Sequence, residues 1–214
     1  MSLFVTLESV VSLHETIRLE AESFAESGNR TWSYLRRMMT MLNVNADFSA
    51  SGKNRWITSE EREIILEELG PPPPYCYPLY IISVDDGRSE RIAYIGKMSS
   101  RTPRFRNGHP AVTKLHAPEY EGRVKRVYLC SVVFRGVDFT YATIEQIQSV
   151  NYADAILASL ESQLIYYFKP PLNSSSSVTE NSKWKWSISL ANNTGQTNFL
   201  SGAICHHPDL PLLV

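Results

Sequence analysis

Two short runs of apolar and aromatic residues flank an acidic turn near the middle of the chain. The runs are residues 78–82 and 94–97, and Asp85, Asp86 and Gly87 lie between them. An Asp-Gly pair favours the backbone conformation that joins two antiparallel strands through a tight turn. The pattern therefore predicts a β-hairpin centred near Gly87.

Two tyrosines of this hairpin, Tyr80 and Tyr94, lie at equal distances from Gly87 along the chain. Residues placed in this way are cross-strand neighbours that point to the same face of the hairpin. We expect the two phenol hydroxyls and the nearby ammonium of Lys97 to converge on one spot. The alternative is that both tyrosines are ordinary strand residues, because tyrosine is common in strands.

The residues before the hairpin show helical periodicity. Apolar residues recur at intervals of three and four over residues 10–24, and a second apolar pattern covers residues 32–42. A third helix is expected to begin at the capping box of residues 58–61 and to end at Gly70. We therefore expect a helical N-terminal region.

After the hairpin, the pattern predicts a loop and helix over residues 101–116 and a third strand over residues 126–134. Residues 152–168 carry leucines at helical spacing, with Glu161 at the edge of the apolar stripe. A structural interpretation turns Glu161 outward or gives it a buried hydrogen-bond partner. Residues 184–190 alternate in the manner of a strand.

These elements predict an α+β fold in which helices flank a small, mainly antiparallel sheet of three strands. We expect a helical N-terminal region over residues 1–70, a proline-rich spacer over 71–76, a core over 77–173 and a β-containing C-terminal extension over 174–214. Four consecutive prolines make the spacer stiff, because they favour the extended polyproline conformation.

Charge is unevenly distributed along the chain, although the net charge is only −1. Residues 91–135 hold ten Lys and Arg against two Glu, whereas acidic residues dominate residues 1–70. A local basic block of this kind favours contact with phosphates, although it can equally be a solvated face. The candidate nucleic-acid contacts are Arg101, Arg106, Lys114, Arg123, Lys125 and Arg126.

Three cysteines, Cys76, Cys130 and Cys205, are widely spaced and form no CxxC pair. This spacing argues against a disulfide framework and against a cysteine zinc site, so we interpret them as buried or incidental thiols. The sequence also contains no long hydrophobic run and no basic start before its first apolar residues. We expect no membrane association and a cytoplasmic location.

Four ordered segments between residues 77 and 173 resemble the motifs of the GIY-YIG nuclease family. Pro78-Leu79-Tyr80 stands at the first tripeptide and Tyr94-Ile95-Gly96 at the second, and an Arg/His segment, residues 104–109, follows them. The helix that carries Glu161 and the segment that ends at Asn173 complete the series. The chain departs from the family in the first tripeptide, which lacks Gly-Ile, and in the interval between arginine and His109.

The resemblance implies a phosphodiester hydrolase that uses one hard cation, Mg²⁺ or Mn²⁺, with Glu161 as its ligand. One carboxylate suffices because Mg²⁺ keeps most of its water ligands. Arg104 would clamp the phosphate, although the family spacing leaves Arg106 as the other choice. Lys97 would lower the pKa of a neighbouring tyrosine or touch the phosphate.

The resemblance also implies roles for the two tyrosines, with Tyr80 the first choice and Tyr94 the second for orienting or deprotonating the attacking water. His109 would carry a proton, or else be structural in a Gly-His-Pro turn. Asn173 would fix the site by hydrogen bonding, or else act as a capping residue.

The leading functional prediction is a metal-dependent endonuclease that cuts DNA, similar to restriction-type family members and therefore a candidate restriction or defence enzyme. The alternative is a catalytically silent nucleic-acid-binding module, against which the presence of a glutamate argues, because binding alone needs no carboxylate. A protein-interaction role of residues 1–70 is a third class. Whether the chain forms a homo-oligomer stays open.

Overall fold

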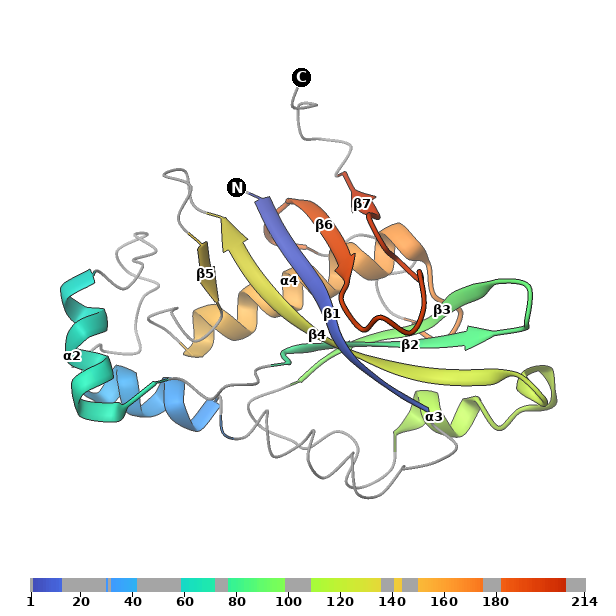
Figure 1. The fold of residues 1–214 in the computed structure, drawn as a ribbon, viewed down its shortest axis with the longest axis horizontal. Coiled ribbons are helices and arrows are strands. Elements are labelled where there is room, and N and C mark those ends of the chain that lie inside the picture. Colours follow the sequence, from blue (N-terminus) through green and yellow to red (C-terminus); the bar gives the residue numbers. More distant parts are fainter. Residues whose placement is uncertain are drawn as a thin grey trace.

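The protein is an α+β structure in which helices lie around one extended, twisted sheet (Figure 1). The computed structural model describes residues 2–12, 30, 32–41, 59–71, 77–98, 109–135, 141–143, 150–174 and 182–206. Statements below refer to these residues.

The sheet is much larger than the three antiparallel strands expected from the sequence, so that part of the fold prediction is wrong. It is a mixed sheet curled into a half-barrel, with strand order β3-β2-β4-β1-β6-β7 and with β5 paired to β4. The expected three strands form one end of it, as β3, β2 and β4. Of the strands beyond β4, β6 (Ser187–Asn192) overlaps the strand pattern predicted for residues 184–190. Its place in the same sheet and the strand at the N-terminus were missed because their partners lie far away in sequence.

The predicted hairpin is formed by β2 (Leu79–Asp85) and β3 (Glu90–Lys97), and β4 (Val124–Arg135) pairs antiparallel to β2. Gly87 lies in the connection with a φ of 84°, a left-handed conformation that glycine adopts at no steric cost. The strand predicted after the hairpin corresponds to β4.

The N-terminal residues form a strand, β1 (Ser2–Ser12), and not a helix that begins near Val10. This strand pairs antiparallel with β4 and parallel with β6 (Ser187–Asn192). Leu3, Val5 and Leu7 are fully buried, and their period of two is the pattern of a strand with one face in the core. The rest of the expected first helix, residues 13–24, lies outside the described residues.

Two further predictions before the hairpin are confirmed. Residues 32–41 are helical, and α2 spans Ser59–Leu69 and is followed by Gly70 with a φ of 74°. The N–H of Gly70 donates to the carbonyl of Leu66 at 3.1 Å, which closes the last turn of the helix. Residues 72–76 of the expected spacer lie outside the described part.

The C-terminal strands β6 and β7 (Ile204–Cys205) belong to the same sheet as the hairpin, and the short β5 (Tyr141–Thr143) pairs with the end of β4. One hydrophobic cluster includes side chains from β1, from residues 32–38, from the hairpin and from β6. Residues before position 70, between 77 and 173, and after position 173 therefore contribute to one sheet and one hydrophobic core.

The two faces of the hairpin carry different helices. On one face, Ile81 and Ile95 pack with leucines of α4 (Val150–Phe168). On the other face, Tyr80 and Ile82 pack with residues in and just after α3 (Pro110–Lys114), which is followed by the 3-10 helix η1 (Pro118–Tyr120). β3 is an edge strand of the sheet. Because side chains alternate along a strand, its two faces pack against different helices.

Candidate active site

A cavity of about 360 Å³ opens at the outer edge of β3, where the two faces of the hairpin meet. Its walls come from β3, from α3, from α4 and from the turn after α4. The lining includes Tyr94, His109, Lys114, Glu161, Ser162 and Asn173. The structure therefore brings together five candidate site residues that are far apart in sequence.

Tyr80 does not line this cavity, because its side chain is fully buried beneath the hairpin face. Its hydroxyl lies 2.7 Å from Nε2 of His109. Nδ1 of His109 accepts a hydrogen bond from the N–H of Ala111 at 3.2 Å and so caps α3. A neutral imidazole that accepts at Nδ1 carries its proton on Nε2, so His109 donates to the Tyr80 oxygen.

Gly96 is required by the position of Tyr80. The two residues are directly opposite in the register of β2 and β3, and a Cβ atom at position 96 would overlap the Cζ and Oη atoms of Tyr80. Because these atoms belong to a fully buried ring, little relief is available by movement. The glycine of the Tyr94-Ile95-Gly96 motif therefore makes room for the other tyrosine.

Tyr94 is partly buried and borders the cavity. Its ring centroid lies 6.0 Å from that of Tyr80 and 5.0 Å from that of His109. The two tyrosines share a face as expected, but Tyr94 is opposite Ile82 and not opposite Tyr80. Tyr94 is therefore the tyrosine that a molecule in the cavity would meet.

The expected register is wrong for two reasons. The turn is centred between Gly87 and Arg88 and not on Gly87, since Asp85 is opposite Glu90, and an irregularity falls between Ile82 and Ser83. Each feature moves the pairing by one position, and two such moves keep the tyrosines on one face. The sequence thus predicts their shared face correctly and their pairing incorrectly.

Glu161 and Asn173 both bond to the outward-pointing backbone of β3. Oε1 of Glu161 accepts from the N–H of Lys97 at 3.0 Å. The Asn173 amide makes two bonds of 2.9 Å to Ile95, accepting from its N–H and donating to its carbonyl. These side chains act as a substitute for a neighbouring strand, which protects an edge that would otherwise be unpaired.

The turn after α4 delivers Asn173 to this edge. Lys169 leaves the helix with a φ of 49°, and the N–H of Asn173 donates to the carbonyl of Pro170 at 3.1 Å. The N–H of Leu172 adds a bond of 3.0 Å to the carbonyl of Ala93. The Lys-Pro-Pro-Leu-Asn segment is therefore the structural connection between α4 and β3.

Lys97 does not place its ammonium beside the tyrosines, as the sequence had suggested. Nζ donates to Oδ1 of Asp154 on α4 at 2.8 Å, and the side chain is only 12% exposed. Lys97 follows Gly96, which shares a face with Tyr80, so its own side chain points to the opposite face. Its backbone N–H is the atom that donates to Oε1 of Glu161.

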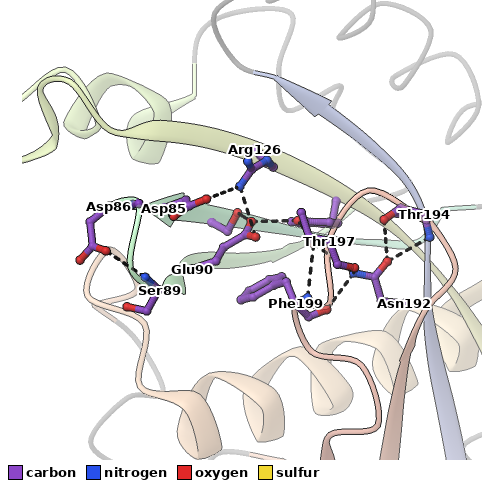
Figure 2. Close-up of polar contacts among 12 residues, drawn as sticks. Asp85, Asp86, Ser89, Glu90, Arg126, Asn192, Thr194, Thr197 and Phe199 are labelled. Atoms are coloured by element: carbon purple, nitrogen blue, oxygen red, sulfur yellow. Dashed lines mark hydrogen bonds and ion pairs between the residues drawn. The ribbon is translucent and has the colours of Figure 1, made fainter.

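The candidate nucleic-acid contacts differ in their exposure to solvent and in their ion pairs. Lys114 is exposed and lines the cavity, and Arg123 is exposed beyond η1. Lys125 is buried on β4. Arg126 is engaged by two carboxylates, with Nη1 lying 3.1 Å from Oδ2 of Asp85 and 3.2 Å from Oε2 of Glu90 (Figure 2).

Glu90 is the centre of a polar network that is distinct from the cavity. Its Oε1 accepts from the hydroxyls of Ser83 at 2.5 Å and Tyr128 at 2.8 Å. The Tyr128 hydroxyl also lies 2.8 Å from that of Thr197, so the network reaches the loop after β6 (Figure 2). Burial, assisted by the neighbouring Glu90, raises the pKa of Tyr128 above its usual value.

Arg101, Arg104 and Arg106 lie outside the described residues. The choice between Arg104 and Arg106 as the phosphate clamp therefore stays open. Cys76 also lies outside them, whereas Cys130 and Cys205 are buried free thiols, as expected. Burial raises the pKa of Cys205 to about 12, which keeps it protonated and unreactive.

Sequence reasoning missed Asp154 as the partner of Lys97. A signal was present, because Asp154 precedes Glu161 by two helical turns and the two residues therefore share a face of the predicted helix. It also missed the steric role of Gly96, which required the register of the hairpin to be known.

The described ranges contain no group of three or more His, Cys, Asp or Glu side chains that could jointly hold a metal ion. Among the described residues that line the cavity, Glu161 is the one carboxylate, and Tyr94 and Ser162 are also part of the lining. An oxygen-rich set of this kind suits a hard cation that retains its water ligands. Within the same part of the chain, no helix is long and apolar enough to cross a membrane.

No family model, curated protein or solved structure matches the chain.

Proposed function

We propose that the protein is a divalent-metal-dependent endonuclease that hydrolyses DNA phosphodiester bonds, as a restriction or defence enzyme. The observation that carries this proposal is the cavity at the edge of β3. Tyr94, His109, Lys114 and Glu161, from three segments of the chain, border it and supply a phenol, an imidazole, an ammonium and a carboxylate. These are the groups that phosphodiester hydrolysis needs to activate water and to neutralise charge on the phosphate.

Glu161 is the residue that would hold Mg²⁺ or Mn²⁺. A bound cation would neutralise charge on the phosphate and stabilise the leaving oxygen. The Lys97 N–H orients the Glu161 carboxylate by bonding to one of its oxygens. The fit is therefore to a metal with one protein ligand and otherwise water and phosphate ligands.

Tyr94 is the proposed residue for orienting the attacking water, because it borders the cavity and Tyr80 does not. This reverses the preference drawn from the sequence. Tyr80 would act on the site through His109, whose Nε2 lies 2.7 Å from its hydroxyl. Lys114, on the opposite wall from Glu161, would contact a phosphate of the substrate.

A catalytically silent nucleic-acid-binding module is the second candidate, and one observation favours it. Glu161 and Asn173 both satisfy backbone groups of β3, so their presence has a structural explanation without any catalysis. The argument that a binding module needs no carboxylate is weaker as a result. An activity measurement has to separate the two candidates.

The cytoplasm remains the proposed location. The support is that Cys130 and Cys205 are both free thiols, the state that a reducing compartment maintains.

The test is cleavage of supercoiled plasmid by the purified chain in Mg²⁺, in Mn²⁺ and in excess chelator. We expect nicked or linear product only when a cation is present. Glu161→Gln, purified in parallel, is the control for contaminating nucleases, because Gln keeps an acceptor for the Lys97 N–H and removes the charge. Equal cleavage with and without chelator would exclude the metal mechanism. Binding without cleavage on varied DNA and RNA would favour the silent module.

A further inference from the structure

Lys97 is held by α4 at two places. Its backbone N–H donates to Oε1 of Glu161 at 3.0 Å. Its ammonium donates to Oδ1 of Asp154 at 2.8 Å and lies 3.3 Å from the carbonyl oxygen of the same residue. The last residue of β3 is thus fastened to the helix through both its main chain and its side chain.

The spacing of the two acidic residues makes this double contact possible. Asp154 and Glu161 are separated by two helical turns, about 10 Å along the axis, and lie on the same face of α4. An extended lysine side chain covers much of that distance. One strand residue therefore sets the position of α4 along β3, and with it the position from which Glu161 reaches the cavity.

The ion pair is partly shielded from water, since the Lys97 side chain is 12% exposed and that of Asp154 is 40% exposed. Removing the carboxylate leaves a shielded ammonium without its counter-charge, although the carbonyl oxygen of residue 154 stays in place, and this loss is unfavourable. Turning toward water then lowers the free energy of the Lys97 ammonium, because water solvates its charge. Because the same residue supplies the N–H that orients Glu161, such a movement reaches the carboxylate directly.

We infer that Asp154 is a positioning residue, which holds the Glu161 carboxylate at the cavity by anchoring the Lys97 ammonium. Asp154 is not one of the residues that line the cavity. Its effect passes through one intermediate residue. The part of this inference that concerns metal binding rests on the proposed function, whereas the part that concerns the Lys97 contacts does not.

Four variants of the full chain test the inference: Asp154→Ala, Asp154→Asn, Lys97→Met and the double variant Asp154→Ala/Lys97→Met. Asn keeps an oxygen acceptor for the ammonium and should retain part of the effect. If Asp154 acts through Lys97, adding Asp154→Ala to Lys97→Met should change nothing further. Tyr34→Phe is the stability control, because it removes a remote hydrogen bond to the carbonyl of Gly70.

The first readout needs neither metal nor DNA. Amide hydrogen exchange measures how well the Lys97 N–H is held by Glu161, and the Ile95 N–H, held by Asn173, is the internal reference. We expect Asp154→Ala to speed exchange at Lys97 about tenfold relative to Ile95, and Tyr34→Phe to leave that ratio unchanged. An unchanged ratio in Asp154→Ala would overturn the inference.

The second readout is the Mg²⁺ concentration that gives half-maximal cleavage. Loss of a group that orients a metal ligand costs roughly 10 to 100-fold in metal affinity, so Asp154→Ala should raise this concentration about tenfold. The rate at saturating Mg²⁺ should change much less. A wild-type Mg²⁺ dependence in Asp154→Ala would overturn the inference. If the wild-type chain cuts nothing, the proposed function fails, and the exchange experiment still decides whether Asp154 positions Glu161.

Discussion

Two glutamates lie on or beside the hairpin, and their surroundings differ in kind. Glu90 sits at the start of β3, where an arginine and two hydroxyls satisfy its carboxylate (Figure 2). Glu161 reaches the end of the same strand, accepts from the N–H of Lys97 and borders a cavity of about 360 Å³. One is enclosed within the protein, and the other faces a space large enough for a phosphate group.

The difference shows that a charged residue in a strongly polar cluster is a weaker functional candidate than one beside a cavity. Arg126 illustrates the point, since its place in a basic stretch suggested a phosphate contact. In the structure, Arg126 forms ion pairs with Asp85 and Glu90. Perturbed or clustered charges also arise in structural networks, so the adjoining cavity is the more informative observation.

The largest expected effects are opposite for the two glutamates: the Glu161 variant should lose cleavage, and the Glu90 variant should lose stability. Glu161→Gln should lower the cleavage rate by about 10³-fold or more, because the charge at the cavity is lost, while stability changes by less than about 1 kcal/mol. Glu90→Gln should cost about 2 kcal/mol of unfolding free energy, because Arg126 loses one of its two carboxylate partners, with little change in cleavage. Denaturant unfolding and single-turnover cleavage measure the two effects.

The comparison fails if Glu90→Gln abolishes cleavage in the folded protein, since the hairpin network would then contribute to the chemistry. It also fails if Glu161→Gln unfolds the chain. In that case the main role of Glu161 is to pair with the edge of β3.

A smaller effect separates the two tyrosines. Tyr94→Phe should reduce the single-turnover rate about 10²-fold with little loss of stability, because its hydroxyl borders the cavity. Tyr80→Phe should instead cost about 1 to 3 kcal/mol of unfolding free energy, because the buried Nε2 of His109 loses an acceptor. Any rate loss in that variant would act through His109. Parent rates in both variants would exclude a water-activating role for either hydroxyl.

The next effect concerns the basic residues. Arg123→Ala and Lys114→Ala remove exposed charges and should each lower the salt dependence of DNA binding by about one unit of slope. Arg126→Ala should leave the slope unchanged, because its charge is already neutralised within the protein. Fluorescence anisotropy over a salt series measures the slopes. A full unit of slope lost in Arg126→Ala would show that its ion pairs open on DNA.

The smallest expected effect is a pH dependence from the enclosed network. A hydrogen bond from the Gly87 N–H and, to a smaller extent, one from Arg126 hold the pKa of Asp85 below its usual value of 3.8. A carboxyl whose pKa is lower when folded stabilises the protein above its unfolded pKa, and this contribution is lost as pH falls through the folded pKa. The melting temperature of wild type should thus exceed that of Asp85→Asn at pH 6, and the difference should shrink below about pH 4. A constant difference would exclude this linkage.

Local patterns predicted the hairpin and two of the helices. The Asp-Gly turn marked the hairpin, Gly70 marked the end of α2, and the leucine spacing of residues 152–168 marked α4. The sheet beyond β4 was not predictable in this way. Whether Val10 belongs to a helix or a strand depends on its partner Tyr128 in β4, and short apolar runs do not specify distant partners.

The prediction of the candidate site had the same limit. Which residues gather at the cavity could be predicted in part, as for Tyr94, His109, Glu161 and Asn173. Which way each side chain points could not. The burial of Tyr80 depends on the register of β2 and β3, which the turn and one irregularity set together. The direction of the Lys97 side chain depends on that register as well.

The position of β1 has a consequence for the order in which the protein can fold. This strand ends at Ser12, whereas its neighbours begin at Val124 and Ser187. The hairpin and its helices are closed by contacts nearer in sequence, so they can assemble while β1 is still without partners. Pairings between such distant segments form slowly, and an apolar strand that waits for them is exposed to aggregation. The half of the molecule that carries the cavity can therefore form before the strand that joins it to the rest.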